Sequence, residues 1–130
     1  MILVYVAGPY RAPHNWGIEC NVRRAETLAL EVWRSGHVAL CPHTLSRFYQ
    51  GTLPDATWLA GDLVMLERCD AVLLVEGWAT SAGTRAEIVH ARASDIPVFE
   101  SLDELNEWTK RRGRRGQHAG KPAAPGSGVG

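Results

Sequence analysis

The stretch SAGTRAE, residues 81–87, places two hydroxyl groups and a glycine directly ahead of the carboxylate of Glu87. In one interpretation, residues 84–87 form a capping box, in which the side chains of Thr84 and Glu87 satisfy backbone N–H groups at a helix start. In the other, Glu87 lies in the first turn of that helix, where the helix dipole favours an ionised carboxylate. An ionised carboxylate at the lip of a pocket is a usable nucleophile. The motif by itself leaves both interpretations open.

Three other side chains could cooperate with such a carboxylate. Tyr5 lies in the apolar run MILVYVA, and a buried tyrosine needs a partner for its hydroxyl, which Glu87 could be. Asp62 lies between Leu59 and Leu66 on a predicted helix face, so it either faces partly inward or belongs to the helix surface. Glu76 ends a predicted strand near the same place.

The segment Gly8-Pro9-Tyr10-Arg11 follows the first apolar run. Gly8 would let the backbone approach a ligand closely, and Arg11 is either a ligand-binding cation or a solvated surface arginine. The segment contains no GxGxxG fingerprint and no Walker loop, so neither a dinucleotide site nor a P-loop is indicated. The absence of a GxSxG elbow argues against acyl hydrolysis.

Alternating strands and helices must position these residues. Short apolar runs predict buried strands, and apolar residues at spacings of three and four predict helices. The predicted strands span residues 1–7, 38–41, 71–76 and 96–99, and the predicted helices span 21–34, 55–68, 84–94 and 101–112, with caps at Asn21, Asp55, Thr84 and Ser101 and a stop at Gly36. Residues 42–54 show turn chemistry without a clear period.

This order predicts a single α/β domain with a flavodoxin-like, doubly wound parallel sheet of four or five strands. Ligands of such sheets bind beyond the carboxyl ends of the strands, at the switch point in strand order. The loops AGPYRAP and GWATSAG should lie side by side there. Trp16, His43 and Trp78 lie in predicted loops or beside them, where they could stack on a base or simply pack.

The net charge of zero hides an asymmetry. Residues 1–109 contain 8 Arg and 14 acidic residues, whereas residues 110–130 contain 6 basic residues and no acid. We expect a folded domain over 1–112 and a disordered basic Gly/Pro-rich tail over 113–130. An acidic body does not predict nucleic-acid binding.

The apolar runs, the first residues and the cysteines bear on the location of the protein and on the kinds of site it can contain. No apolar run is long enough to span a membrane, and the first residues do not form a signal peptide, so a cytoplasmic location is expected. Three widely spaced cysteines predict free thiols. His37, Cys41 and His43 match no zinc pattern, so no metal is expected.

Three segments together, VYVAGPYR, GDLVMLERCDAVLLV and SAGTRAE, resemble the nucleoside 2-deoxyribosyltransferase superfamily over about residues 1–109. The resemblance implies that Glu87 is the nucleophile, that Tyr5 hydrogen-bonds it, and that Asp62 contacts the base or the sugar. It also implies a homodimer or larger homo-oligomer with a shared site, and no cofactor.

One departure from the superfamily pattern bears on the reaction. The transferases carry an aspartate six residues before the nucleophile, and this chain has Ser81 there. The related 2'-deoxynucleoside 5'-phosphate N-hydrolases carry a serine at that position and an arginine in the first loop, matching Arg11. The resemblance therefore favours cleavage of a nucleotide N-glycosidic bond, with substrate-binding roles for Gly8, Pro9, Arg11, Ser81, Gly83 and Thr84.

Two alternatives stay open at this point. The first is base exchange between deoxynucleosides, in which a free base replaces water as acceptor. The second is a nucleotide-sensing module without turnover, in which Glu87 merely caps its helix.

Overall fold

Four parallel strands form the centre of the computed structural model, which describes residues 1–118. They are β1 (Leu3–Ala7), β2 (Val38–Leu40), β3 (Ala71–Leu74) and β4 (Val98–Phe99), arranged in the order β2-β1-β3-β4. The strands lie inside the predicted apolar runs, and the predicted single-domain, flavodoxin-like sheet is confirmed. Because β1 and β3 are neighbours, the switch point of the sheet lies between them.

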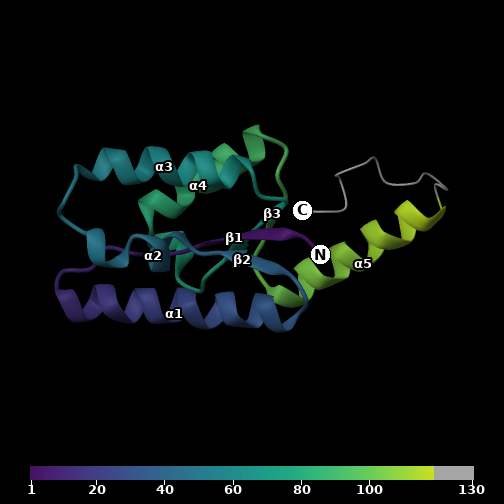
Figure 1. Cartoon of the computed structure of the whole chain (residues 1–130), viewed down its shortest axis with the longest axis horizontal. Coiled ribbons are helices and arrows are strands. Elements are labelled where there is room, and N and C mark those ends of the chain that lie inside the picture. Colours follow the sequence, from purple (N-terminus) through teal and green to yellow (C-terminus); the bar gives the residue numbers. More distant parts are fainter. Residues whose placement is uncertain (119–130) are drawn as a thin grey trace.

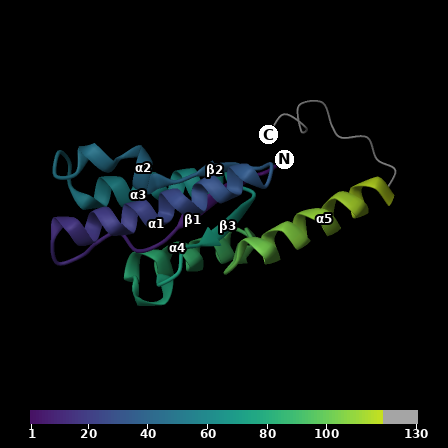
Figure 2. The ribbon, with the colours of Figure 1, turned by 90° about the horizontal axis from the view of Figure 1, so that it is seen from below.

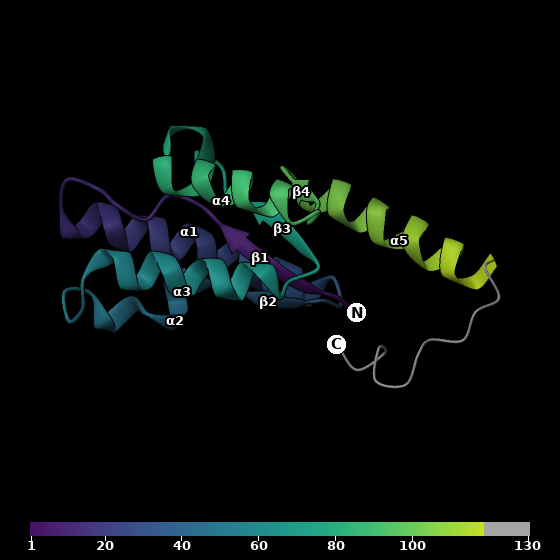
Figure 3. The same ribbon diagram turned by 90° about the horizontal axis from the view of Figure 1, so that it is seen from above.

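Helices cover both faces of the sheet (Figure 1). Successive residues of a strand point to opposite faces, so Val4 and Val6 pack with α1 (Asn15–Arg34) and α5 (Leu102–His118). Tyr5 points to the other face and packs with α3 (Asp55–Glu67) and α4 (Ala82–Ala93). In the view from above, α3 and α4 lie in front of the strands and α1 lies behind them (Figure 3).

Helix α1 begins earlier than the sequence predicts. Its cap is His14, whose Nδ1 accepts a hydrogen bond from the Gly17 N–H at 3.0 Å. Asn21, predicted to be the cap, lies within the helix and donates its side-chain amide to the Tyr10 carbonyl at 3.0 Å. The predicted stop is confirmed, because Gly36 adopts a φ of +88° that favours glycine.

The segment between β2 and α3 is more regular than expected. It contains the short helix α2 (Pro42–Leu45) and a 3-10 turn, η1 (Arg47–Tyr49). Asp55 is the first residue of α3 rather than its cap, which is Pro54. The spacing of Ala56, Leu59, Leu63 and Leu66 predicts that all four face inward on α3. In the structure Leu66 is buried and Leu63 is partly buried, whereas Ala56 and Leu59 are exposed.

Helix α5 begins as predicted, with the Ser101 hydroxyl accepting a hydrogen bond from the Glu104 N–H at 3.2 Å. It continues past Arg112 to His118, so the predicted boundary between domain and tail falls inside a helix. Seen from below, its far end extends away from the sheet (Figure 2). The rest of the predicted tail, residues 119–130, lies outside the described residues.

Two further findings concern the described part of the chain. Cys20, Cys41 and Cys69 are free, as predicted. Over residues 1–118, no helix is both long and apolar enough to cross a bilayer.

Candidate active site

The carboxyl ends of β1 and β3 form the floor of a cavity. Ala7 pairs with Leu74, and the Val75 N–H donates to the Ala7 carbonyl at 2.8 Å, which brings the two following loops side by side as predicted. The cavity has a volume of about 420 Å³. Its walls come from residues 8–11, from α2, from the first turns of α3 and from the start of α4.

Tyr5 and Glu87 meet at this floor. The Tyr5 side chain is fully buried, and its hydroxyl donates a short hydrogen bond to Oε2 of Glu87, which lines the cavity. The predicted contact between the two side chains is therefore confirmed. Burial, reinforced by the Glu87 charge, raises the pKa of Tyr5 far above its ordinary value, so the phenol remains a hydrogen-bond donor.

The capping box at Thr84 is wrong. Helix α4 is capped by Ser81, whose Oγ accepts hydrogen bonds from the Thr84 N–H at 3.2 Å and from the Thr84 hydroxyl at 2.9 Å. Thr84 is buried as the third residue of the helix. Glu87 is the sixth residue, so it lies in the second turn and has no capping role.

Because α4 begins at Ala82, the position of Glu87 relative to the helix dipole also differs from the prediction. The dipole effect is strongest within the first turn, so it offers Glu87 little. Burial raises the pKa of Glu87 to about 7; the hydrogen bond from Tyr5 opposes this rise and the charge of Asp62 adds to it. The expected stabilisation of the carboxylate by the helix dipole is therefore not the dominant influence.

One face of α3 forms the wall opposite α4. Asp55, Trp58, Leu59 and Asp62 recur at helical spacing and all line the cavity. Asp62 is partly buried, and burial raises its pKa to about 6. Of the two orientations that the sequence left open, Asp62 therefore has the partly inward one, and the exposed Leu59 faces the cavity rather than the core.

Arg11 lies at the mouth of the cavity but is already paired. Its guanidinium forms an ion pair with Asp55 on α3, and both side chains are more than half exposed. Beside it, the Tyr10 hydroxyl donates to Oε1 of Gln50 at 2.6 Å. The two interactions connect the loop after β1 with the segment that leads into α3.

Gly8 and Gly83 both line the cavity, but their surroundings differ in how much space they leave for a side chain. A Cβ at Gly8 would lie 2.5 Å from Cβ of Val75, so Gly8 is required by close packing against the chain after β3. A ligand is therefore not needed to explain it. A Cβ at Gly83 would meet no atom within 4 Å outside the backbone of its own helix, so the space beside Gly83 is open.

His43 is the one of the three possible base-stacking residues, with Trp16 and Trp78, that the structure places at the cavity. It is buried on α2, lines the cavity, and its Nε2 hydrogen-bonds the Pro9 carbonyl at 2.9 Å. Since a carbonyl only accepts, Nε2 carries the proton and Nδ1 is left as an acceptor. Burial lowers the pKa of His43, although its hydrogen bond to Pro9 opposes this, so the neutral ring is favoured.

Three other residues considered from the sequence as possible site residues lie outside the cavity. Trp16 is exposed on α1 with Arg23 over its ring, and Trp78 packs against the core under α4. Neither lines the cavity, and nor does Glu76, which is exposed. Over the described residues, no cluster of three or more His, Cys, Asp or Glu side chains is suited to hold a metal ion.

Over residues 2–101 the sequence matches the family described as a domain of unknown function, DUF7768. The chain belongs to this family. The match covers every element that builds the cavity and ends just before α5 of this DUF7768 member. No curated protein matches the chain.

Structural comparison adds a likeness in fold. A solved structure of the 2-deoxyribosyltransferase from the psychrotolerant bacterium Bacillus psychrosaccharolyticus is similar, with a TM-score of 0.50 and 18% sequence identity. The similar region covers 74% of this chain and 69% of the other. The resemblance to the deoxyribosyltransferase superfamily is thus confirmed at the level of the fold.

Proposed function

We propose that this protein cleaves the N-glycosidic bond of a nucleoside 5'-monophosphate, most naturally a deoxynucleotide, through a covalent glycosyl-enzyme on Glu87. The observation that carries the proposal is the buried Tyr5 hydroxyl that holds Glu87 at the floor of the cavity. The Tyr5 hydroxyl orients the Glu87 carboxylate through Oε2 and leaves Oε1 available to the substrate. A purely structural glutamate would gain more from capping α4, and Glu87 does not cap it.

The proposed reaction has two steps. The Glu87 carboxylate attacks the anomeric carbon as the C–N bond breaks, and the departing base takes a proton from the protonated Asp62. Water then attacks the anomeric carbon of the glycosyl ester and gives a proton to the Asp62 carboxylate, which releases the sugar phosphate and restores both the Glu87 carboxylate and the protonated Asp62. The raised pKa of Asp62, about 6, suits a group that must hold a proton in the first step.

The two carboxyl groups titrate as a pair. Burial raises both pKa values, to about 6 for Asp62 and about 7 for Glu87, and Asp62 contributes to the rise at Glu87. Such a pair passes through a state that holds one proton. The reactive form is the arrangement of that state with the proton on Asp62 and the charge on Glu87, which is the less populated of the two because the pKa of Glu87 is the higher.

The phosphate site of the proposal is the mouth of the cavity. Ser81 uses its oxygen lone pairs to cap α4, so its O–H can donate to a ligand. The N–H groups of Ala82 and Gly83 belong to the first turn of a helix, which binds anions readily, while the Thr84 N–H is bonded to the Ser81 cap. Arg11 has five N–H donors, so it can meet a phosphate by turning from Asp55.

Base exchange is the second candidate, and the similarity in fold to a 2-deoxyribosyltransferase favours it. Both reactions share the glycosyl-enzyme and differ only in the acceptor. Adding a second free base to the reaction separates them, because exchange yields a new nucleoside or nucleotide and hydrolysis yields free sugar.

The test is base release from a panel of nucleotides and nucleosides, followed by chromatography and by mass spectrometry of the intact protein. We expect free base, and a glycosyl adduct on the wild-type protein. Glu87→Gln keeps an acceptor for Tyr5 but loses the nucleophile, so release should fall by on the order of ten-thousandfold or more. Near-normal release by Glu87→Gln would refute the covalent route, and no release by the wild type would favour the sensing module.

The proposal extends to assembly. Large apolar side chains are exposed on α2, on η1 and on α3 next to the cavity, and they include Leu45, Phe48, Tyr49, Leu53 and Leu59. A homodimer or larger homo-oligomer that covers them would also border the active site. Light scattering on the purified protein tests this, and a monomeric mass at working concentration would contradict it.

A further inference from the structure

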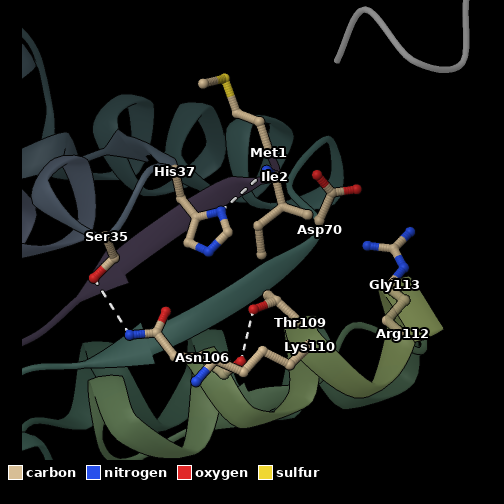
Figure 4. A pocket seen from close by; sticks show the side chains of 10 residues that line it. All are labelled: Met1, Ile2, Ser35, His37, Asp70, Asn106, Thr109, Lys110, Arg112 and Gly113. Carbon is tan, nitrogen blue, oxygen red and sulfur yellow. Dashed lines mark hydrogen bonds between the residues drawn. The ribbon is translucent and has the colours of Figure 1, made fainter.

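A second cavity lies at the opposite edge of the sheet. Ile2, His37 and Asp70, which directly precede β1, β2 and β3, form one side of it. The side of α5 between Asn106 and Gly113 forms the other, and the volume is about 690 Å³ (Figure 4). Small-molecule sites have volumes of this order. None of these residues belongs to the proposed active site.

His37 presents a buried donor to this cavity. Its side chain is 9% exposed, and its Nδ1 accepts a long hydrogen bond from the Ile2 N–H at 3.4 Å. Burial, with a further contribution from the terminal amino group, lowers the pKa of His37, so the ring is neutral and its proton lies on Nε2. Figure 4 shows this second nitrogen pointing away from Ile2, and within the described residues it has no hydrogen-bond partner.

Two cationic side chains, Lys110 and Arg112, line the same cavity from the side formed by α5. Arg112 stacks over the Trp108 ring at 5.2 Å, and no carboxylate of the described residues pairs with it. Lys110 is held only loosely, 3.9 Å from Glu107. The one carboxylate in the lining, that of Asp70, accepts a hydrogen bond from the Leu3 N–H at 2.8 Å.

These groups are complementary to an anion with several acceptor oxygens. The imidazole N–H of His37 has no hydrogen-bond partner among the described residues, so an acceptor from a ligand could take that place. A guanidinium fork matches the geometry of phosphate, and an ammonium adds charge. The space beyond these groups, bordered by Asn106 and Thr109, suits a small polar body such as a sugar.

We propose that this cavity is a second ligand site, distinct from the carboxylate cavity, that binds a small phosphate monoester through His37 Nε2–H, Arg112 and Lys110. The site lies on the far side of the sheet from Glu87, so its occupancy does not require the proposed reaction. A phosphate at this edge would connect α5 to the ends of three strands.

Imidazole NMR tests the proposal directly, because the described histidines include one at each cavity. The ligands are ribose 5-phosphate and, as its uncharged control, ribose. The expected result is a saturable shift of the His37 Nε2 signal, assigned from its loss in His37→Gln, with ribose 5-phosphate and not with ribose. The shift should persist in Arg11→Ala, which removes the cation of the other cavity, and His43 reports binding there separately.

Variants on α5 sharpen the result. Arg112→Ala should weaken the affinity for ribose 5-phosphate about tenfold, as loss of one charge-assisted contact does. Arg111→Ala is the matched control, because this exposed neighbour does not line the cavity. A His37 signal that does not move, or equal losses for Arg111→Ala and Arg112→Ala, would overturn the proposal.

Discussion

The surroundings of Glu87 oppose the ionised form that its proposed role requires. The carboxyl group is buried, it lies near Asp62, and its one recorded donor is the Tyr5 hydroxyl. Burial raises its pKa from the ordinary 4.5 to about 7. A carboxylate held this way is less solvated than one in water, and it exists in quantity only near neutral pH and above.

The raised pKa of Glu87 predicts a specific dependence of stability on pH. The unfolded chain loses this proton near pH 4.5 and the folded chain near pH 7, so between these values the unfolded state binds fewer protons. The contribution to stability is therefore complete below pH 4.5 and is lost as the pH rises to 7. The loss is roughly 3 kcal/mol, since one pKa unit is worth about 1.4 kcal/mol.

Urea unfolding of wild type and Glu87→Gln across this range measures the effect. The variant should lack the Glu87 contribution, so its advantage over the wild type should grow with pH and level off above 7. Asp62 contributes with the same sign in both proteins, so its own contribution from burial cancels in the difference and only its coupling to Glu87 remains. Glu76→Gln removes an exposed carboxylate and serves as control; parallel curves for wild type and Glu87→Gln would contradict the assignment.

We predict that Arg11 determines which substrate the mouth of the cavity favours. If a 5'-phosphate replaces Asp55 as its partner, the wild-type protein should prefer the monophosphate over the nucleoside. Arg11→Ala should reduce the ratio of the two kcat/KM values roughly ten- to a hundredfold, since charge-assisted bonds are worth about 1.5–3 kcal/mol. Asp55→Asn should raise the ratio, because it releases Arg11 from its pair.

A control separates this local effect from net charge. Arg24→Ala removes an exposed charge from α1, away from the cavity, and should leave the ratio unchanged. A wild-type preference for the unphosphorylated nucleoside would contradict the phosphate site and leave base exchange as the better proposal.

Among the elements, α4 shows where sequence reasoning succeeds and where it stops. The helix and its place after β3 were predictable from spacing, and so was the contact between Tyr5 and Glu87. The cap was not, because Ser81 and Thr84 are both good caps and lie three residues apart. Tertiary packing decides between them by burying Thr84.

Helices α1 and α3 also differ from the elements predicted from the sequence, for related reasons. Helix α1 begins with a histidine cap and contains Gly17 in its first turn, neither of which is a common helix signal. Helix α3 carries apolar residues on several sides, so its inward face has no clear phase, and Leu59 and Val64 remain exposed. The sheet was predictable because continuous apolar runs are typical of strands buried on both faces.

The two cavity glycines predict opposite outcomes for the same substitution. Gly83→Ala adds a methyl group where nothing lies within 4 Å, in the first turn of a helix, so stability should hold or rise by up to ~1 kcal/mol. The methyl group would project into the open space beside the proposed phosphate site, so KM for the nucleotide should rise. Gly8→Ala forces a contact of 2.5 Å with Val75 and should destabilise the fold by about 1–3 kcal/mol.

Thermal unfolding and steady-state kinetics on the two variants distinguish these effects. Loss of stability in Gly83→Ala, or none in Gly8→Ala, would show that the packing around these loops differs from that described.

At the scale of the whole molecule, the cavities occupy opposite edges of one sheet and α5 borders only the second. The helix is attached through its first half. Leu105 is fully buried against α1 and the sheet, and Trp108 packs on Phe99 with ring centroids 5.4 Å apart. The family match ends before this helix, so the proposed active site is built without it.

We therefore propose that residues 113–130 are dispensable for the folded domain, and predict that deleting them leaves its stability within ~1 kcal/mol and base release unchanged. Among the side chains of α5 that the structure describes, those that pack onto the body precede Gly113, so we expect the deletion to leave the buried apolar area that holds the helix in place. It also leaves Arg112 in place, although the shortened helix loses its last turns. Matched thermal unfolding and turnover assays on the two lengths measure this. A large drop in melting temperature would mean that the removed residues contact the acidic body, and that the folded unit extends beyond residue 112.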